Sequence, residues 1–351
     1  MGQQPGAGRP NLEQVAALAG VSRATVSRVV NGMATVAPGL RDRVEQAISQ
    51  LDYVPNRAAR SLVTRRADTV ALVVSEPDDR LFADPFFSDI VRGVSQELSR
   101  ANLQLTLMLA QSYPDLDRIE RYLRSAPIDG VLLISEHATH DPLPRSLVRA
   151  GTPVVIGGRP LRPDVVTPFV DNDNLDGARQ ATEHLLERGR QVIATVAGPP
   201  DMAAGMDRLA GYRSALGPGF DASRVEHGDF TTAGGEEATA RLLARVPELD
   251  GLFVASDLMA IGALKALRRA GRRVPDDVAV VGFDDSPMAE VAEPALTTVR
   301  QQTVLQGRLM TRMLLATGRP DVAIPEDDGL PPVHGVEQLV LPVTLVVRES
   351  S

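Results

Sequence analysis

The spacing of hydrophobic positions changes along this chain of 351 residues. Near the N-terminus, apolar residues recur every three or four positions, which is the spacing of short amphipathic helices. From Thr69 onward, short apolar runs alternate with longer stretches of helical spacing. That alternation predicts parallel sheets with helices on both faces. The chain is therefore predicted to be an α/β protein with a small all-α head and a large body.

The first two helices of the head are joined by a tight turn. Asn11 is a good N-cap for the first helix, with Gln14 at the capping-box position. Gly20 supplies the turn, and Ser22 can cap a second helix over residues 23–30. This arrangement is typical of a helix-turn-helix, whose second helix can enter the major groove of DNA.

A third helix, which Pro38 can open, is predicted to close a small core. The inward positions at helical spacing are Leu12, Val15, Ala16, Leu18, Ala19, Val26, Val29, Val30, Leu40, Val44, Ala47, Ile48 and Leu51. The positions left outward on the second helix are Arg23, Ala24, Thr25, Ser27 and Arg28. Arginine and small hydroxyl residues suit base edges and phosphates. The alternative is a three-helix module with no role in DNA binding.

A segment of about two helical turns follows the head, from Asn56 to Leu62. It contains helix formers where a linker would have Gly, Ser and Pro. A helix this short is not stable by itself in water, so we expect it to form when two copies pack together on DNA. An ordinary linker between domains is the alternative.

The body is predicted to have two lobes. Strands are expected at residues 70–75, 103–109, 130–135, 153–158, 192–198, 251–256 and 278–284, and helices at 88–100, 175–189, 208–216, 236–246 and 259–270. A weak internal echo, between residues 128–135 and 249–256, supports two similar lobes. A cleft between the carboxyl ends of their strands would form a natural site for a small molecule.

Charge separates the two parts of the chain. Residues 1–66 carry nine arginines and four acidic residues, a net charge of +5, whereas the remainder carries 28 basic and 41 acidic residues, a net charge of −13. A basic arm on an acidic body suits phosphate contact at one end only. A nonspecific DNA-binding protein would be basic throughout.

Several other classes lack their signatures in this sequence. There is no Cys, no apolar run of about 18 residues and no export signal, so we expect a cytoplasmic protein with no membrane contact. No GxGxxG motif follows a strand, and no phosphate-loop or HExxH motif is present. We therefore expect no enzyme, no cofactor and no metal site. A periplasmic sugar carrier would need an export signal and would not carry the head.

The run Val21-Ser-Arg-Ala-Thr-Val-Ser-Arg-Val29, followed by Tyr53-Val-Pro-Asn-Arg-Ala-Ala-Arg-Ser-Leu62, resembles the lactose-repressor (LacI) family of bacterial transcription regulators. The resemblance extends nearly from end to end. It implies that Arg23, Ala24 and Arg28 read base edges, and it places Ser22, Thr25, Ser27 and Asn31 near phosphates. It also implies a hinge beginning at Asn56, in which Arg57 contacts phosphate and Leu62 wedges between base pairs. Ala24 departs from members that carry an amide there, so the operator sequence cannot be copied from a relative.

The same resemblance implies a body like that of periplasmic sugar-binding proteins. The chain would cross between the lobes at about residue 171, cross back near residues 283–285 and close with residues 296–299. Residues 341–350 resemble the last strand of the family, and no heptad pattern follows them. We therefore expect a homodimer without a tetramerisation helix.

Candidate residues of the cleft also follow from the resemblance. Arg208 would hold oxygens of an effector, and Phe230 would stack on it. The other candidates lie at a helix start or at strand ends: Phe87, Glu136, His137, Arg159, Ser256, Asp257 and Asp284. Charged groups with an aromatic platform suit a polyol. As alternatives, Asp257 and Asp284 could be helix caps or salt-bridge partners within a lobe, and Phe87 could belong to the core.

The predicted function is a repressor that a small sugar releases from a palindromic operator. Stretches such as residues 157–160 and 198–202 are similar to those of actinobacterial repressors of this family that answer to cellobiose or related β-glucosides. A co-repressor mechanism, or another sugar or small metabolite, remains the alternative. The expected domains are a DNA-binding head (1–55), a hinge and linker (56–67) and an effector-binding and dimerisation domain (68–351).

Overall fold

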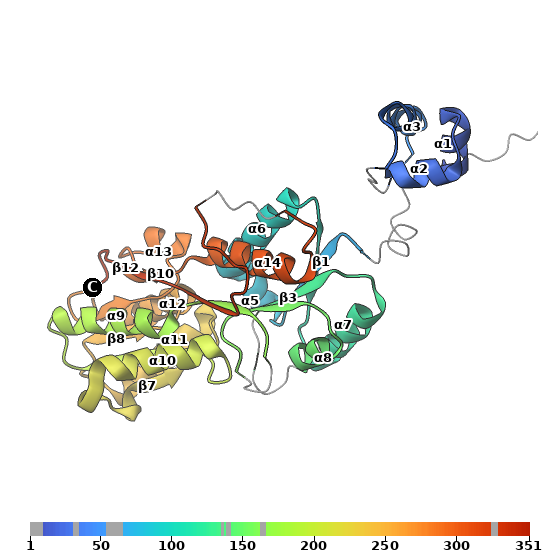
Figure 1. The fold of residues 1–351 in the computed structure, drawn as a ribbon. Helices are drawn as coiled ribbons and strands as arrows, with labels where there is room; N and C mark the ends of the chain where they lie inside the picture. The colour runs from blue at the N-terminus through green and yellow to red at the C-terminus, as the bar shows by residue number, and fades with distance from the viewer. Residues whose placement is uncertain are drawn as a thin grey trace, which may run out of the picture. The chain divides into compact units, whose positions relative to one another are not determined.

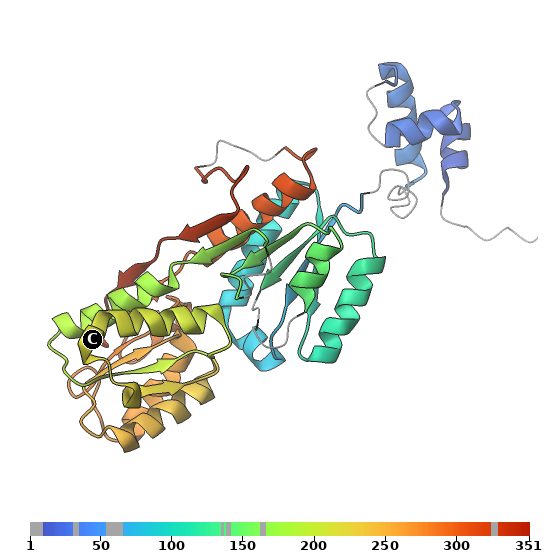
Figure 2. The same ribbon diagram turned by 60° about the horizontal axis from the view of Figure 1, so that its bottom comes forward.

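The computed structural model of the chain describes residues 10–30, 35–53, 66–134, 137, 142–161, 166–323 and 329–351. It divides into two compact units, Met1–Ala67 and Asp68–Ser351, which we call the head and the body. Figure 1 shows the head as blue helices, and Figure 2 shows the body as two lobes of sheet covered by helices.

The head contains three helices, α1 (Leu12–Ala19), α2 (Arg23–Val30) and α3 (Pro38–Gln50). The predicted capping box is present, because Asn11 Oδ1 accepts hydrogen bonds from two backbone N–H groups and Gln14 Oε1 accepts one from Asn11 N–H. Gly20 ends α1 in the left-handed conformation, with a φ of 62°. Ser22 Oγ accepts from Thr25 N–H at 3.1 Å. These local predictions are confirmed.

One small hydrophobic core holds the head together. Its buried residues are Val15, Ala16, Ala19, Val26, Val29, Val44, Ala47 and Tyr53. The prediction of an inward position is wrong for Leu18 and Leu40, which are 50% and 36% exposed, because they lie at the edge of the apolar face of their helices. Tyr53, which the sequence grouped with the hinge motif, belongs to this core instead.

The strands of the body form two parallel sheets and one antiparallel pair. The sheet of the first lobe has the order β11-β5-β4-β3-β1-β2, and that of the second lobe has the order β7-β6-β8-β9. The short strands β10 and β12 pair antiparallel. The strands are β1 (Thr69–Val74), β2 (Gln104–Leu109), β3 (Gly130–Ile134), β4 (Val154–Gly157), β5 (Phe169–Asn172), β6 (Ile193–Ala197), β7 (Val225–His227), β8 (Gly251–Val254), β9 (Ala279–Val281), β10 (Thr298–Arg300), β11 (Gln338–Leu341) and β12 (Thr344–Val346).

Helices cover both sheets, as the alternation of patterns predicts. The first lobe carries α5 (Asp78–Ala83), α6 (Pro85–Arg100), α7 (Tyr113–Ser125), α8 (Leu143–Arg149) and α14 (Thr303–Gly318). The second lobe carries α9 (Asn174–Glu187), α10 (Ala203–Leu216), α11 (Thr232–Arg245), α12 (Asp257–Arg269) and α13 (Pro287–Val291), with short 3₁₀ turns at Gly217–Gly219 and Ala222–Arg224. All seven predicted strands and all five predicted helices are present, with shifted ends.

The chain passes between the lobes three times, after β5, after β10 and after β11. The return predicted near residues 283–285 is wrong. Asp284 and Asp285 have positive φ angles, 119° and 54°, and Asp284 N–H donates to Val299 O at 2.8 Å. The backbone therefore turns back through α13 and β10 within the second lobe, and it crosses only where β10 leads into α14.

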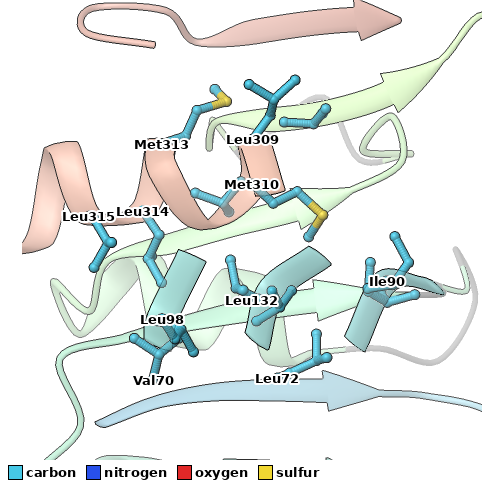
Figure 3. Packing of buried hydrophobic residues seen from close by; sticks show 14 of the residues in the cluster. Val70, Leu72, Ile90, Leu98, Leu132, Leu309, Met310, Met313, Leu314 and Leu315 are labelled. Carbon is cyan, nitrogen blue, oxygen red and sulfur yellow. The ribbon is translucent and has the colours of Figure 1, made fainter. Parts of the chain in front are cut away.

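The core of the first lobe forms where α14 packs against α6 and the sheet. Figure 3 shows Leu309, Met310 and Leu314 of α14 beside Leu132 of β3. The two helices approach closely because Gly93 has no side chain, and a Cβ atom there would lie 2.2 Å from Val304 O. The first lobe is therefore tightly packed beside the cleft.

Candidate functional site

The side chains of α2 divide into a buried and an exposed face. Val26 and Val29 are buried against the other head helices, whereas Arg23, Ala24 and Arg28 are exposed. The structure thus presents the three residues expected at base edges on one short helix. A helix of this size with an exposed polar face can enter a major groove.

The polar residues at the start of α2 have few fixed partners. Thr25 Oγ1 lies 2.9 Å from Ser22 Oγ, and Arg23 NH1 lies 3.7 Å from Glu13 Oε1 in a solvent-exposed ion pair. Such exposed pairs contribute little, so these side chains can rearrange on a partner at low cost. Ser27 is half-buried on the same helix. Four predicted DNA-binding residues lie outside the described residues: Asn31, Asn56, Arg57 and Leu62.

Between the two lobes of the body lies a cavity of about 80 Å³, which we call the inner cavity. Five of the nine predicted effector residues line it: Arg159, Arg208, Phe230, Ser256 and Asp284. Residues near the crossing segments line it too, among them Asp171, Asn174, Gln301 and Gln306. Glu136 lies outside the described residues.

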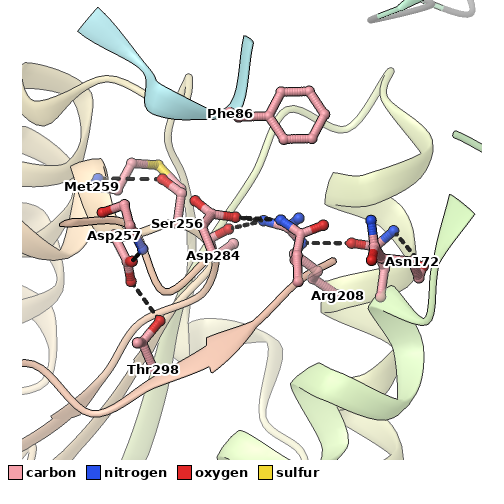
Figure 4. A network of polar contacts seen from close by, with 12 residues as sticks. Phe86, Asn172, Arg208, Ser256, Asp257, Met259, Asp284 and Thr298 are labelled. Carbon is pink, nitrogen blue, oxygen red and sulfur yellow. Dashed lines mark hydrogen bonds and ion pairs between the residues drawn. The ribbon is translucent and has the colours of Figure 1, made fainter. Parts of the chain in front are cut away.

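Arg208 of α10 is the central cation of the inner cavity. Its side chain is buried, its Nε donates to Asn174 Oδ1 at 2.8 Å, and its NH1 donates to the carbonyl of Ala255. The same NH1 lies 3.4 Å from Asp284 Oδ1, and Figure 4 shows this network. Burial lowers the pKa of Arg208, and the nearby carboxyl of Asp284 opposes that shift. A buried guanidinium ringed by acceptors is a strong donor for ligand oxygens.

Three carboxyl groups surround this cation. Burial raises the pKa of Asp84, that of Asp171 to about 6 and that of Asp284 to about 7. Asp284 Oδ1 also accepts from Gln301 Nε2 at 2.6 Å. Carboxyl groups that are neutral part of the time can donate as well as accept hydrogen bonds. That capacity matches hydroxyl groups, which also do both.

Phe230 supplies the aromatic wall of the cavity. The guanidinium carbons of Arg80 and Arg208 lie 4.6 and 5.7 Å from the centre of its ring. Gly198 makes room for the ring, since a Cβ atom there would lie 2.3 Å from Phe230 Cζ. Phe230 itself has a positive φ of 63°, so its place depends on the turn after β7.

Phe87 does not line the cavity, contrary to the prediction from the sequence. It is 3% exposed and belongs to the core of the first lobe, while the adjacent Phe86 lines the cavity. The two rings meet edge to face at 5.3 Å. One residue along a helix turns the side chain by about 100°, so only the packing of α6 decides which ring reaches the cleft.

Ser256 and Asp257 have mainly structural contacts. Ser256 caps α12 by accepting from Met259 N–H at 3.3 Å, although it also lines the cavity. Asp257 does not line it, and its carboxylate accepts from Thr298 Oγ1 at 2.6 Å and Ser286 N–H at 2.7 Å (Figure 4). Asp257 thus holds the turn that carries Asp284. Its partners are a hydroxyl group and a backbone N–H, so it is neither the helix cap nor the salt-bridge partner of the alternative.

Arg80, His137 and Arg159 of the first lobe make polar contacts with the second lobe across the cleft. Arg159 Nε and NH2 donate to the carboxylate of Asp207 at 3.1 and 2.8 Å. His137 Nδ1 lies 2.9 Å from Asp201 Oδ2. Arg80 NH1 lies 3.5 Å from the sulfur of Met202. These contacts link side chains of the first lobe to the start of α10 and the loop before it.

His137 also lies next to a buried carboxylate of its own lobe. Its Nε2 is 3.6 Å from Glu76 Oε1, and Glu76 in turn pairs with Arg80. Hydrogen bonding to Glu76 and Asp201 raises the pKa of His137 to about 8 despite its partial burial. His137 lines a second cavity of about 520 Å³, which we call the outer cavity.

Several cavity residues escaped prediction from the sequence: Arg80, Asp84, Phe86, Asp171, Asn174 and Gln301. Asp171 could have been found, because it lies at a predicted crossing between the lobes. Gln301 follows the short strand β10, which the hydrophobic pattern does not reveal. Nothing in the sequence marks Arg80 as a cleft residue, because it lies on a short helix that only the tertiary structure places beside the cleft.

Two family patterns match this chain. Residues 11–56 match the family described as "Bacterial regulatory proteins, lacI family", and residues 182–351 match a "Periplasmic binding protein-like domain". Across the part of the chain that the structure describes, no helix is long and apolar enough to cross a membrane. The same residues contain no group of three or more His, Cys, Asp or Glu side chains placed to hold a metal ion.

Similar proteins cover nearly the whole chain. The HTH-type transcriptional regulator CelR of Thermobifida fusca is 51% identical over 97% of this chain and 98% of its own length. The ribose operon repressor of Halalkalibacterium halodurans is 34% identical over 87% of this chain and 89% of its own length. These relatives are transcriptional regulators.

Two solved structures are similar to the whole chain. A complex of the transcriptional regulator CelR with cellobiose is 49% identical, covers 98% of this chain and 100% of its own, and has a TM-score of 0.75. A lac repressor dimer bound to operator and the anti-inducer ONPF is 26% identical, covers 98% and 99%, and has a TM-score of 0.81. The predicted combination of a helix-turn-helix head and a two-lobed, parallel-sheet body is thereby confirmed.

Proposed function

This chain belongs to the lacI family of bacterial regulatory proteins, and from that membership we propose that it is a sugar-responsive transcriptional repressor. It binds a palindromic operator as a homodimer through its head. It leaves the operator when cellobiose or another β-glucoside binds between the lobes of its body. The similarity to CelR, a relative with a solved cellobiose complex, supports this effector.

The observation that carries the proposal is the composition of the inner cavity. A buried guanidinium, three carboxyl groups with raised pKa values and an aromatic wall converge on one space between the lobes. The proposed effector contacts there are Arg208, Phe230 and Asp284, with Arg159 and Ser256 at the border. Convergent polar groups around an apolar wall are what a hydroxyl-rich ring requires.

The head supplies the DNA contacts of this proposal. Arg23, Ala24 and Arg28 read base edges, Ala24 only by apolar contact such as a thymine methyl group. Ser22, Thr25, Ser27 and Asn31 contact phosphates. The paired hinges contribute Asn56, Arg57 and Leu62 at the minor groove.

The contacts across the cleft provide a way for sugar binding in the body to affect operator binding. The inner cavity of about 80 Å³ is about half the size of the roughly 150 Å³ cavity that accommodates benzene. A pyranose ring can therefore enter only if the lobes move apart, which changes the contacts of Arg80, His137 and Arg159. A coupling free energy of about 1–3 kcal/mol per site between sugar binding and operator binding suffices to change operator occupancy several-fold.

We also infer that the chain is not an enzyme and that it acts in the cytoplasm. The acidic body with its cleft is an effector-binding unit in this proposal, and it needs neither a cofactor nor a metal. Regulator relatives that match the chain over nearly its full length support this reading.

Fluorescence anisotropy on DNA from the region upstream of the gene tests the proposal. The measurement is made with and without each sugar of a panel that includes cellobiose. We expect the chain to bind the DNA tightly, cellobiose to release it, and the other sugars to release it less well. Tight binding that no sugar releases would overturn the effector. Binding only in the presence of a ligand would show a co-repressor mechanism instead.

A further inference from the structure

Helix α14 connects two opposite edges of the first-lobe sheet. Its 16 residues span about 24 Å at roughly 1.5 Å per residue. The helix begins beside the inner cavity, which Gln301 and Gln306 line. It ends beside the amino ends of β1 and β3, at the edge of the sheet where the body begins with Asp68. One element therefore reaches from the proposed sugar site to the place where the predicted linker joins the body.

The first turn of α14 is bonded to the segments that cross between the lobes. Gln306 Oε1 accepts from Asn172 Nδ2, and Asn172 Oδ1 accepts from Gln302 N–H, both at 2.9 Å. Asn172 is the last residue of β5, where the chain first passes to the second lobe. Gln301 Nε2 donates to Asp284 Oδ1 at 2.6 Å, and Asp284 is a proposed contact of the effector. A change in the angle between the lobes, or a ligand on Asp284, therefore acts on the start of α14.

The middle of α14 is packed against the sheet, so its two ends move together. Leu309, Met310 and Leu314 are buried in the core of the first lobe (Figure 3). Leu314 lies so close to β3 that a Cβ atom at Gly130 would be 2.8 Å from its Cδ1. Close-packed interiors have low compressibility and transmit strain. A displacement of the first turn is therefore passed to the last turn.

A buried arginine comes directly after α14. Arg319 is 7% exposed, and three carboxylates from separate segments surround its guanidinium. Its NH1 donates to Asp68 Oδ1 at 3.2 Å and to Asp129 Oδ2. Its Nε and NH2 donate to the two carboxylate oxygens of Asp321, each at 3.1 Å. The end of the helix also lies tightly against the sheet, because a Cβ atom at Gly318 would be 3.0 Å from Asp129 O.

The backbone of Asp68 is held in an uncommon conformation. Its φ is 53°, in the left-handed region that Asp and Asn adopt more readily than most other residues. Its carbonyl accepts from Gln104 N–H at 2.9 Å, and its carboxylate accepts from Arg319. The path by which the chain enters β1 is thus fixed by β2 through the backbone and by the end of α14 through a side chain.

We propose that α14 transmits the effect of sugar binding from the cleft to the linker, and that Arg319 is the positioning residue that attaches the linker to this helix. When the lobes change their angle, the start of α14 moves with the crossing segments. The contact between Arg319 and Asp68 passes this displacement to the first residue of the body. The linker then leaves the geometry in which the paired hinges fit the operator. This inference rests on the proposed function of the chain as a sugar-released repressor.

The quantity that tests this attachment is the operator Kd at saturating cellobiose divided by the operator Kd without sugar, which we call the release ratio. Fluorescence anisotropy on the full chain measures both constants. Asp68→Asn removes the negative charge that faces Arg319, and asparagine still adopts a positive φ. We expect this variant to lower the release ratio by about threefold or more. Its cellobiose affinity, measured by titration calorimetry, should stay within about twofold of that of the unmodified chain.

Asp321→Asn is the matched control. It removes a carboxylate from the same guanidinium by the same chemical change, but Asp321 follows α14 and does not lie at the start of the body. We expect the release ratio of Asp321→Asn to equal that of the unmodified chain. If the cluster only stabilised the fold, both variants would lower the unfolding temperature and neither would change the release ratio. Arg319→Lys keeps the charge but loses the planar fork, and it should lower the release ratio as Asp68→Asn does.

The outcomes separate this inference from the proposed function. If cellobiose releases the unmodified chain and Asp68→Asn keeps the same release ratio, the attachment is wrong while the sugar-released repressor stands. An equal fall in Asp68→Asn and Asp321→Asn would overturn the assignment to the start of the body. Weaker cellobiose binding by Asp68→Asn would also overturn it, because the residue would then act on the cleft. If no sugar of the panel releases the unmodified chain, the proposed function fails and this inference fails with it.

Discussion

The exposed face of α2 and the cleft of the body are built in opposite ways. On α2, eight consecutive residues carry Arg23, Ala24 and Arg28 outward and Val26 and Val29 inward, so the period of one helix decides the whole face. In the cleft, the lining residues come from positions between 75 and 306 and meet only through the topology of two sheets. The first site is a property of a segment, and the second is a property of the fold.

The two sites also differ in how firmly their side chains are held. Arg23 has one exposed ion pair at 3.7 Å, whereas Arg208 is buried with three acceptors around it. A loosely held arginine can adapt to the edges of bases, while a fixed one demands a ligand of matching shape. Changes at Arg208 should therefore affect sugar binding strongly and leave operator binding alone, whereas changes on α2 should be graded among DNA sequences.

The largest expected effect comes from Arg208→Met. The substitution removes the buried guanidinium that is proposed to donate to ligand oxygens, a loss of about 3 kcal/mol that should weaken sugar binding roughly 100-fold. Operator affinity without sugar should stay within about twofold of the unmodified chain. Calorimetry with cellobiose measures the sugar affinity, and anisotropy with operator DNA measures the operator affinity. Arg213→Met, on the exposed side of the same helix, is the control. Equal loss of both activities in a folded variant would contradict the separation of the two sites.

Arg23→Ala is the corresponding change on α2. Loss of a contact with a base edge should weaken operator binding by about 1–3 kcal/mol while binding to a scrambled duplex changes little. Sugar affinity should not change. Anisotropy on both duplexes is the measurement, and Arg268→Ala, which removes an exposed charge from the body, is the control. An equal loss on both duplexes would make Arg23 a phosphate contact instead.

The contacts of His137 across the cleft predict a dependence on pH. Hydrogen bonds to Glu76 and Asp201 raise its pKa from 6.5 to about 8. Glu76 belongs to the same lobe as His137, so only the bond to Asp201 stabilises the joined lobes, and that stabilisation is present below pH 6.5 and is lost as the pH rises through about 8. Because His137 is partly exposed, the effect is at most about 1 kcal/mol. A lobe-to-lobe fluorescence pair measured from pH 6 to 9 should report opening at the high end.

His137→Gln isolates this dependence from that of the buried carboxyl groups. Asp171 and Asp284, with pKa values of about 6 and about 7, titrate in both proteins, so the difference between the two profiles belongs to His137. Identical profiles would show that the imidazole does not hold the lobes together.

The smallest expected effect belongs to the pair of Arg159 and Asp207. The Arg159 side chain is 42% exposed, so the pair should contribute at most about 1 kcal/mol to holding the lobes together, and less at high salt. A double-mutant cycle of Arg159→Gln and Asp207→Asn, followed by the sugar affinity at two salt concentrations, measures it. A coupling above about 2 kcal/mol would mean that this pair, and not Arg208, dominates the cleft.

Local signals predicted the head well. Asn11, Gln14, Gly20 and Ser22 act on neighbours within four residues, so their effect is visible in the sequence itself. In the body, short apolar runs predicted seven strands for the same reason. The strand β7 (Val225–His227) has only three residues and little apolar character, and it forms because β6 offers an edge to pair with.

The sequence by itself determined the helix-turn-helix, the α/β body and, through its resemblance to a family, Arg208, Phe230 and Asp284 as residues of the cleft. Only the tertiary structure decided that Phe86 and not Phe87 lines the cavity, that the chain returns to the first lobe after β10, and that Arg80 lines both cavities. The physical reason is the distance along the chain over which each interaction acts. Capping and periodicity act within a few residues, whereas burial and charge in a cleft depend on what the rest of the chain packs around each side chain.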